Sequence, residues 1–388
     1  MQHRIVVLGA GYAGTMAAGR LARRIRREDV TITLVNAHPD FVERVRLHQL
    51  ATGQDLKPRP LSEMLKGTGV DLRIAQVTAV DVDRKTVTLT GSELPYDTLV
   101  YALGSGWNPQ GVPGTDEHAY EIASRPGALR LRDRLTRLGA GQTVTVVGGG
   151  LTGLEAATEI AESRPDLDVA LVTRGDLGDW LSPKGRAHLR KVFGKLGITV
   201  HEHAAVTAVE PTRVITSGGP VPAAVTLWTT GFAVHPIAAS TTLKLGDNGQ
   251  IVVDETMRSV SHPDVYAVGD AALAMGAGNK PLRMSCASGG PTAWQAADSI
   301  AARLTGGKFP NAPLRYFNQC ISLGRKEGLI QYVTADDRAV RAALTGRFAA
   351  VYKELICKGA AWNVANPTFG LPVRRRPLTT TSTAQSPA

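Results

Sequence analysis

The chain begins with a short apolar run, a glycine-rich turn and a segment in which apolar residues recur at helical spacing. Residues 4–8 predict a buried strand, and residues 9–14 contain three glycines. Residues 15–27 predict a helix, and residues 31–35 form a second apolar run. We expect these elements to form a right-handed β-α-β unit in which the two strands are parallel.

The same pattern returns 139 residues further along the chain. Residues 143–147 predict a strand, residues 148–153 contain four glycines, and a helix is expected to about Ser163. Residues 169–172 predict the strand that follows. The recurrence of a whole strand-helix-strand unit predicts two dinucleotide-binding folds, one for each turn.

Each turn has the pattern G-x-G-x-x-G between a strand and a helix, which is the context that this motif requires. The first glycine makes a tight turn, the second lets the backbone approach a pyrophosphate, and the third lets the helix pack closely on the strand. The helix N-terminus then faces the anion. The candidate cofactor-binding residues are Gly9, Gly11, Tyr12, Ala13 and Gly14 in the first turn and Gly148, Gly150, Leu151, Thr152 and Gly153 in the second.

The residue that ends the second strand of such a unit normally contacts the adenosine ribose through a carboxylate. Asn36 stands at this position in the first copy, and Thr173 stands there in the second, followed by Arg174. Without the acid there is no repulsion against a 2′-phosphate, and a guanidinium can pair with one. The pattern therefore favours NADPH or relaxed specificity over strict NADH. The alternative is that Arg174 is a solvated loop residue.

Composition narrows the function further. The 388 residues carry a net charge of +10, 41 glycines and 5% aromatic residues, which suits a nucleotide-binding α/β scaffold and excludes a disordered chain. Three cysteines make neither a disulfide framework nor a CxxC pair, so we expect a reducing, cytoplasmic compartment. The sequence has no run of 18 apolar residues and no basic–aromatic motif for nucleic acid, and we predict no metal site.

Two further segments resemble a known superfamily. Residues 96–105 resemble the YDxLVxATG segment of the two-dinucleotide-domain flavoprotein reductases, and residues 265–270 resemble their GD motif. The order of the motifs along the chain is also that of the superfamily. The resemblance covers about residues 4–305 and implies FAD and either NADH or NADPH as cofactors.

Within this superfamily the chain most resembles type II NADH:quinone oxidoreductases and apoptosis-inducing-factor-like reductases. Residues 148–155 match their GGGxTGxE pattern, and residues 227–232 match their hWxxG turn beside the nicotinamide. Residues 41–53 and 285–304 resemble the segments that run past the flavin. Residues 290–295 depart from the family's Gln-containing turn at the quinone-side helix, which leaves the identity of the electron acceptor open.

The resemblance also implies roles for single residues. The implied FAD contacts are Asn36, Arg44, Val77, Gly104, Gly269 and Asp270, and the implied NAD(P)H contacts are Thr173, Arg174, Thr230 and Gly231. Glu155 is the catalytic candidate on the nicotinamide or flavin side, and His48 and Gln295 are candidates for proton supply to the acceptor. The alternatives are an ordinary first-turn helix glutamate for Glu155 and a structural histidine for His48.

The expected fold class is α/β, with two Rossmann-like, three-layer ββα domains, the second inserted in the first, and a small C-terminal α+β region. We expect the FAD-binding domain at 1–110 and 241–318 and the NAD(P)H-binding domain at 111–240. A C-terminal interface region at 319–371 and a disordered tail at 372–388 complete the chain.

The interface region contains one candidate amphipathic helix. Its apolar positions at helical spacing are Val340, Leu344, Phe348, Val351 and Leu355, and the cations beside them are Arg341, Arg347, Lys353 and Lys358. Three partners for this segment stay open: the anionic inner face of a membrane, the rest of the protein, or a second copy in a homodimer.

Together these features predict an FAD-dependent NAD(P)H oxidoreductase. It would pass hydride from NAD(P)H to FAD and two electrons to a quinone or quinone-like acceptor by a ping-pong mechanism. Two alternatives stay open. One is a soluble reductase for a small quinonoid metabolite or for a partner protein such as a ferredoxin or oxygenase. The other is a slow NAD(P)H-responsive redox sensor. Chemistry on disulfides or sulfide is disfavoured because no cysteine precedes Cys286.

Overall fold

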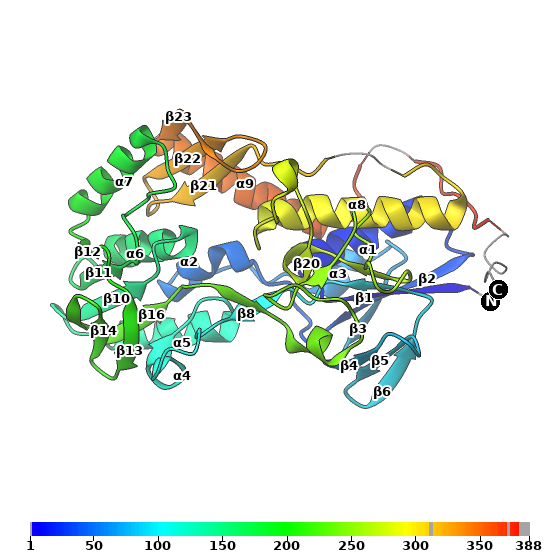
Figure 1. Ribbon diagram of the computed structural model, residues 1–388, viewed down its shortest axis with the longest axis horizontal. Helices are drawn as coiled ribbons and strands as arrows, with labels where there is room; N and C mark the ends of the chain where they lie inside the picture. Colours follow the sequence, from blue (N-terminus) through cyan, green and yellow to red (C-terminus); the bar gives the residue numbers. More distant parts are fainter. Residues whose placement is uncertain (1, 310–312, 371–372, 380–388) are drawn as a thin grey trace.

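The computed structural model describes residues 2–309, 313–370 and 373–379 (Figure 1). A parallel five-stranded sheet in the order β19-β7-β1-β2-β3 forms the centre of the first fold. Its strands are β1 (His3–Leu8), β2 (Val30–Asn36), β3 (Asp71–Ile74), β7 (Thr98–Tyr101) and β19 (Val265–Ala267). The four apolar residues that end β1 are almost completely buried, as expected for a parallel sheet that is covered on both faces.

Two layers cover this sheet. Helices α1 (Tyr12–Arg24) and α8 (Cys286–Thr305) pack on each other along one face, and Figure 1 shows an antiparallel sheet on the other side. That second sheet consists of β4 (Val77–Asp81), β5 (Thr86–Leu89) and β6 (Ser92–Pro95). The short helices η1 (Arg44–Arg46), α2 (Leu47–Ala51) and α3 (Leu61–Leu65) follow β2. This arrangement is the three-layer ββα fold predicted from the sequence.

The second fold repeats the parallel sheet in the order β12-β11-β10-β16-β9. Its strands are β9 (Ala119–Tyr120), β10 (Thr143–Val147), β11 (Asp168–Val172), β12 (Thr199–His201) and β16 (Val225–Trp228). The helices are α4 (Thr115–His118), α5 (Arg125–Thr136), α6 (Leu151–Ser163) and α7 (Pro183–Lys195). An antiparallel sheet of β13 (Val206–Glu210), β14 (Arg213–Thr216) and β15 (Gly219–Pro222) completes it, and the predicted fold class is confirmed.

The chain passes between the two folds along a pair of antiparallel strands. It leaves the first fold through β8 (Ser105–Trp107) and returns through β17 (Phe232–Val234), and these two strands pair with each other. The boundaries at 110/111 and 240/241 stay predictions. The remaining short elements of the returning segment are η2 (Pro236–Ser240), β18 (Ile251–Val252), η3 (Gly269–Ala271), β20 (Ala272–Leu273) and η4 (Ala277–Asn279).

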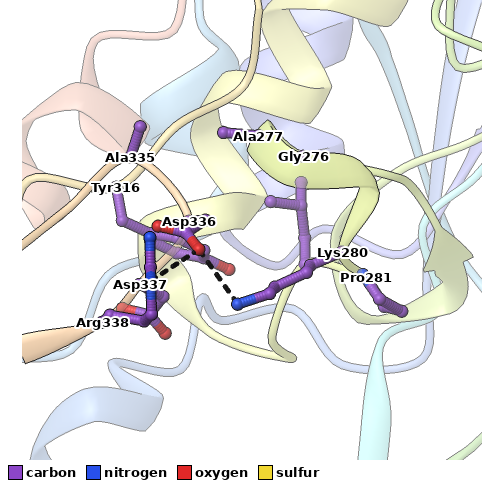
Figure 2. Close-up of a pocket in the computed structure, with 10 residues that line it drawn as sticks. Gly276, Ala277, Lys280, Pro281, Tyr316, Ala335, Asp336, Asp337 and Arg338 are labelled. Atoms are coloured by element: carbon purple, nitrogen blue, oxygen red, sulfur yellow. Dashed lines mark hydrogen bonds and ion pairs between the residues drawn. The ribbon is translucent and has the colours of Figure 1, made fainter.

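The C-terminal region is a small α+β unit. It consists of an antiparallel sheet of β21 (Asn318–Ser322), β22 (Gly328–Val333) and β23 (Ala339–Thr345), followed by α9 (Arg347–Ala365). Helix α9 packs on this sheet and also contacts α1, while α6 and α7 contact the sheet from the second fold. Figure 2 shows a pocket where this region meets the first fold. There Asp336 binds Lys280 at 3.0 Å and Arg338 at 2.9 Å.

Two expectations for the end of the chain are wrong. Val340 and Leu344 lie in strand β23, so the predicted amphipathic helix begins later, at Arg347. The disordered tail does not begin at 372, because residues 373–379 bind α1 and α8. The Arg376 amide donates to the Arg24 carbonyl at 2.9 Å, and the Thr379 amide donates to the Leu304 carbonyl at 3.0 Å. The rest of the predicted tail, 380–388, lies outside the described residues.

In the part of the chain that the structure describes, every helix is either too short or too polar to cross a bilayer.

Candidate functional site

The first glycine turn is closed on one side and open on the other. Gly9 has a φ of +95°, and a Cβ there would collide with the carbonyl of Ala102 at the end of β7. A Cβ on Gly14 would collide with the carbonyl oxygen of Gly9. A Cβ on Gly11 would meet nothing within 4 Å, so this glycine faces open space at the N-terminus of α1.

The second turn has the same geometry. Gly148 has a φ of +123° and lies against Thr229, and a Cβ on Gly153 would collide with the Gly148 carbonyl. Gly150 faces open space and begins α6, as Gly11 does for α1. Neither helix has a side-chain cap, so the first amides of both remain available to an anion. Both turns therefore fit a dinucleotide pyrophosphate.

Asn36 lies next to the first turn and supports it. Its Oδ1 accepts a hydrogen bond from the Ala10 amide at 2.9 Å, and its Nδ2 donates to the His38 carbonyl at 2.7 Å. In the second copy, Thr173 is buried against Gly149. Both residues thus pack on their glycine turns, and their contacts with a ribose stay predictions.

Arg44 brings several of the expected FAD contacts together. Its Nη1 donates to the carbonyl of Ser105 at 2.7 Å and lies 3.5 Å from Oδ2 of Asp270. The Ser105 hydroxyl donates to the same Asp270 oxygen at 2.6 Å. The guanidinium lies 4.9 Å from the ring centre of Phe232. Arg44 therefore contacts both crossing strands and Asp270 at once.

One nitrogen of Arg44 has no partner. Its Nη2 is buried and makes no hydrogen bond to any described residue. Burial lowers the pKa of Arg44 and Asp270 opposes this shift, so the cation would gain from a second negative partner. The Tyr12 hydroxyl is also buried without a partner among the described residues. These two free donors, beside the open first turn, fit a bound FAD.

Of the remaining FAD candidates, Gly269 lies against the same turn. Gly104, with a φ of +74°, immediately precedes β8. The Gly269 amide donates to the Thr292 hydroxyl at 3.0 Å, and a Cβ on Gly269 would touch Ala13. Val77 is buried at the start of β4, where it pairs with Leu89.

The NAD(P)H candidates lie around the second turn. Arg174 is exposed and lines a surface hollow together with Gln110, Gly148, Trp228 and Thr230. The Thr230 hydroxyl is buried and has no partner among the described residues, and Gly231 follows it with a φ of +71°. Leu151 and Thr152 are half-buried in the first turn of α6. The structure thus brings Arg174 and Thr230 to one hollow beside Gly148.

Glu155 forms a buried ion pair that the sequence analysis did not predict. One carboxylate oxygen lies 2.9 Å from Nζ of Lys353 on α9 and accepts the Ser322 amide at 3.0 Å. The Lys353 ammonium also donates to the Cys320 carbonyl at 3.1 Å. Burial disfavours both charges, but their attraction outweighs it. The pKa of Glu155 lies below its ordinary value and that of Lys353 lies above its ordinary value, so both are ionised at neutral pH.

His48 lies beside this pair, whereas Gln295 does not. Burial lowers the pKa of His48 to about 4, although Glu155 opposes the shift, so the imidazole is neutral at pH 7. Its Nε2 is buried without a partner among the described residues. Gln295, on α8, donates to the Glu255 carbonyl at 2.6 Å, and its contacts do not bring it to Glu155 or His48.

Lys353 lies on the buried face of α9. One face of α9 carries small buried residues at a spacing of four or eight positions: Ala349, Cys357 and Ala361. Lys353, four positions after Ala349, lies on the same face. A lysine within a stripe of small buried residues indicates an internal partner. Of the cations expected beside the apolar positions, Lys353 is thus the one that pairs with an internal carboxylate.

Comparisons with known proteins agree with this geometry. The sequence profile of the pyridine nucleotide-disulphide oxidoreductase family matches residues 3–301. An NADH dehydrogenase-like protein of Mycobacterium tuberculosis is 31% identical over 317 residues, covering 74% of this chain and 77% of that protein. The demethylphylloquinone reductase NdbB of Synechocystis is 28% identical over 345 residues, covering 83% of this chain and 84% of that protein.

Solved structures show the same fold. A sulfide:quinone oxidoreductase from Aquifex aeolicus has a TM-score of 0.80 at 21% identity, with 98% of each chain covered. NDH2 from Plasmodium falciparum, solved in complex with NADH, has a TM-score of 0.78 at 16% identity, covering 95% of this chain and 97% of that one. At these identities the likeness concerns the fold alone.

Two neighbouring glycines provide a matched test of the first turn. Gly14→Ala should prevent stable folding because its Cβ collides with backbone, whereas Gly11→Ala should fold because its Cβ meets no atom. Gly11→Ala should nevertheless weaken FAD binding about tenfold or more, ~1.4 kcal/mol, since the methyl group occupies the face expected to carry the pyrophosphate. Thermal melts and fluorescence titration of the apoprotein with FAD measure the two effects. Equal behaviour of the two variants would contradict this assignment.

Proposed function

The chain belongs to the pyridine nucleotide-disulphide oxidoreductase family, and on this premise we propose that it is an NAD(P)H oxidoreductase that reduces a quinone-type acceptor by a ping-pong mechanism. FAD and NAD(P)H are its cofactors. The observation that carries the proposal is the repeated turn, in which Gly11 and Gly150 face open space at two uncapped helix N-termini. The quinone-type acceptor is supported by relatives named demethylphylloquinone reductase and type II NADH:quinone oxidoreductase.

The protein's part in the reaction is to bind and orient. When bound, the cofactors supply hydride transfer from NAD(P)H to FAD and the delivery of two electrons to the acceptor. The amides at Gly11 and Gly150 would bind the two pyrophosphates. Arg44 would donate its free Nη2 to FAD, and Thr230 would offer its free hydroxyl on the NAD(P)H side.

The Glu155–Lys353 pair supports a role in proton supply. A quinone that takes up two electrons also takes up two protons. Lys353 is fully protonated and is held by Glu155 and by the Cys320 carbonyl, in a region from which most solvent is excluded. We infer that Nζ of Lys353 holds the proton that the reduced acceptor takes up, while His48, which is neutral, contributes shape and polarity.

Thiol chemistry receives no support from the cysteines. Cys286, Cys320 and Cys357 are all free, and none lies in the first 285 residues. Burial raises the pKa of Cys320 to about 11 and also raises that of Cys357, so both stay protonated at neutral pH. A protonated thiol is a poor nucleophile, which makes disulfide or sulfide chemistry the weaker proposal.

Helix α9 presents an apolar face outward, and we propose that this face contacts a membrane. Phe348 is 81% exposed, Leu355 is 62% exposed and Val351 is 54% exposed, whereas the inward face of the helix is built from small residues. Arg347 and Lys358 are exposed nearby, and cations of this kind attract anionic lipid. The remaining alternative for this face is a homodimer contact.

The acceptor test begins with anaerobic reduction by NADH and NADPH, followed by a panel of soluble quinones and a ferredoxin. We expect fast reoxidation by quinones. Glu155→Gln should slow this step about tenfold or more, ~1.4 kcal/mol, while reduction by NAD(P)H changes less than about twofold. Stopped-flow absorbance separates the two half-reactions. A wild-type enzyme that is reoxidised by ferredoxin and not by quinones would reject the proposed acceptor.

The specificity test uses Arg174. Arg174→Glu should raise the KM for NADPH at least about tenfold, because a carboxylate replaces the cation expected beside the 2′-phosphate. The KM for NADH should change by less than about twofold, since NADH carries no such phosphate. Steady-state kinetics with both nucleotides measure the ratio. A similar rise for both would place Arg174 outside the phosphate site.

The membrane test compares two surface changes. Phe348→Ser combined with Leu355→Ser should reduce co-sedimentation with phosphatidylglycerol vesicles about tenfold or more, because both exposed side chains would lie among the acyl chains. Val260→Ser, at a position 51% exposed on the first fold, is the matched control and should have no effect. If the wild type does not bind vesicles and is a dimer, whereas the double variant is a monomer, the exposed face of α9 is a dimer contact.

A further inference from the structure

Glu159 is a second buried glutamate on α6, one helical turn beyond Glu155. Its side chain is 2% exposed. Oε1 accepts a short hydrogen bond from Nε2 of Gln54, and Oε2 has no partner among the described residues. An ionised carboxylate with an unpaired buried oxygen is costly, whereas a carboxylic acid is far less so. The geometry therefore favours a protonated Glu159 in the resting protein.

The charged and polar side chains around Glu159 come from three parts of the chain. Its own helix contributes Glu155 and Glu162, the segment after α2 contributes Gln54, and the turn between β21 and β22 contributes Arg325. Burial raises the pKa of Glu159 to about 7, although Arg325 opposes the shift. Glu159 thus exchanges its proton within the physiological range of pH, while Glu155 stays ionised.

The three glutamates form a row along one face of α6. Positions 155, 159 and 162 are separated by four and three residues, which places neighbouring side chains on the same side of a helix. Glu159 is the least exposed of the three, at 2%, whereas Glu155 is 8% exposed. Glu155 and Glu159 are buried, and Glu162 is half-buried and accepts the amide of Arg325. Helix α6 lies close to α2 (Figure 1) and also contacts β21, and the row ends at the half-buried Glu162.

We infer that Glu159 is a proton-relay residue that returns a proton to the Glu155–Lys353 pair after that pair has protonated the reduced acceptor. The inference rests on the proposed function. For each proton delivered to the acceptor, Lys353 loses one proton. Glu159 then passes one proton towards the pair and becomes a carboxylate. A proton from solvent, entering at the Gln54 and Glu162 end of the row, protonates Glu159 again. The two electrons come from NAD(P)H through the cofactor and do not pass through these side chains.

The transfer requires movement or water. The described residues include no hydrogen bond between the carboxyl groups of Glu155 and Glu159, which are about 5–6 Å apart at Cβ when placed four residues apart on a helix. Rotation of Glu159 about its side-chain torsions, or one bridging water, closes this gap. The free Oε2 is the atom available for either route.

The test compares Glu159→Gln with Glu159→Asp. The glutamine keeps the shape and a hydrogen bond to Gln54 but cannot release a proton, and the aspartate can. In the wild type we expect reoxidation by a soluble quinone to slow as the pH rises through about 7, because the relay acid is lost. Glu159→Gln should be about tenfold slower at pH 6 and should lack this pH dependence, and Glu159→Asp should restore part of both.

Two further readouts distinguish a relay from a structural role. Proton uptake during a single turnover, followed with an indicator dye, should slow in Glu159→Gln in step with reoxidation, while reduction by NADH stays unchanged. An infrared band of a buried protonated carboxyl group should be present at pH 6, weaken by pH 8 and be missing from the variant. Glu121→Gln, at a buried glutamate in the second fold that accepts the Ala123 amide and the Ser124 hydroxyl, is the control and should change neither readout.

The outcomes are separable. A Glu159→Gln variant with wild-type proton uptake and pH profile would overturn the relay, as would a uniform loss of both half-reactions together with a lower melting temperature. A wild-type enzyme that is reduced by NAD(P)H but reoxidised by none of the quinones would overturn the proposed function, and the relay with it, whatever the infrared band shows.

Discussion

The arrangement of the two folds depends on the contact of Arg44 with the strands through which the chain crosses between them. The guanidinium donates to Ser105 on β8 and lies over Phe232 on β17. The chain leaves and re-enters the first fold along these strands, and Arg44 connects both of them to Asp270. The Nη2 of Arg44 is buried without a partner among the described residues, and we propose that a cofactor oxygen binds there. In this proposal, Arg44 would link cofactor binding to the strands that lead to the second fold.

The second constraint is the charged pair beneath α9. Removing one partner of a buried ion pair typically lowers the free energy of unfolding by about 3–5 kcal/mol. The Glu155–Lys353 contact therefore favours the orientation in which α9 packs on the protein. With lysine and small residues facing inward, the large apolar side chains of the helix face outward. The outward apolar face and the inward position of Lys353 are thus consequences of a single helix orientation.

The sequence predicts what is local and misses what tertiary packing creates. Both glycine turns were predictable because strand, turn and helix are contiguous and each glycine has a stated physical task. Glu155 could be named by resemblance. The partners of Lys353 and Glu159 could not be predicted, because they come together only when α9 and the segment after α2 pack against α6. The prediction that Val340 and Leu344 belong to a helix is wrong because a spacing of four residues returns a side chain to the same face of a strand as well as of a helix. Residues 373–379 have few apolar residues but bind through backbone hydrogen bonds, which composition does not reveal.

The strap formed by residues 373–379 has a consequence for how the protein is made. It pairs Arg376 with Ile25, directly after α1, and its Leu378 amide donates to Asp29 at 3.1 Å. During synthesis, α1 leaves the ribosome early, but its packing partners α8 and the strap are made much later. The inserted second fold, in contrast, contains all five strands of its own sheet within residues 119–228. The fold that begins first during synthesis is therefore the one that finishes last. Until the strap is released from the exit tunnel, the backbone groups at the end of α1 remain open to chaperones or to another nascent chain.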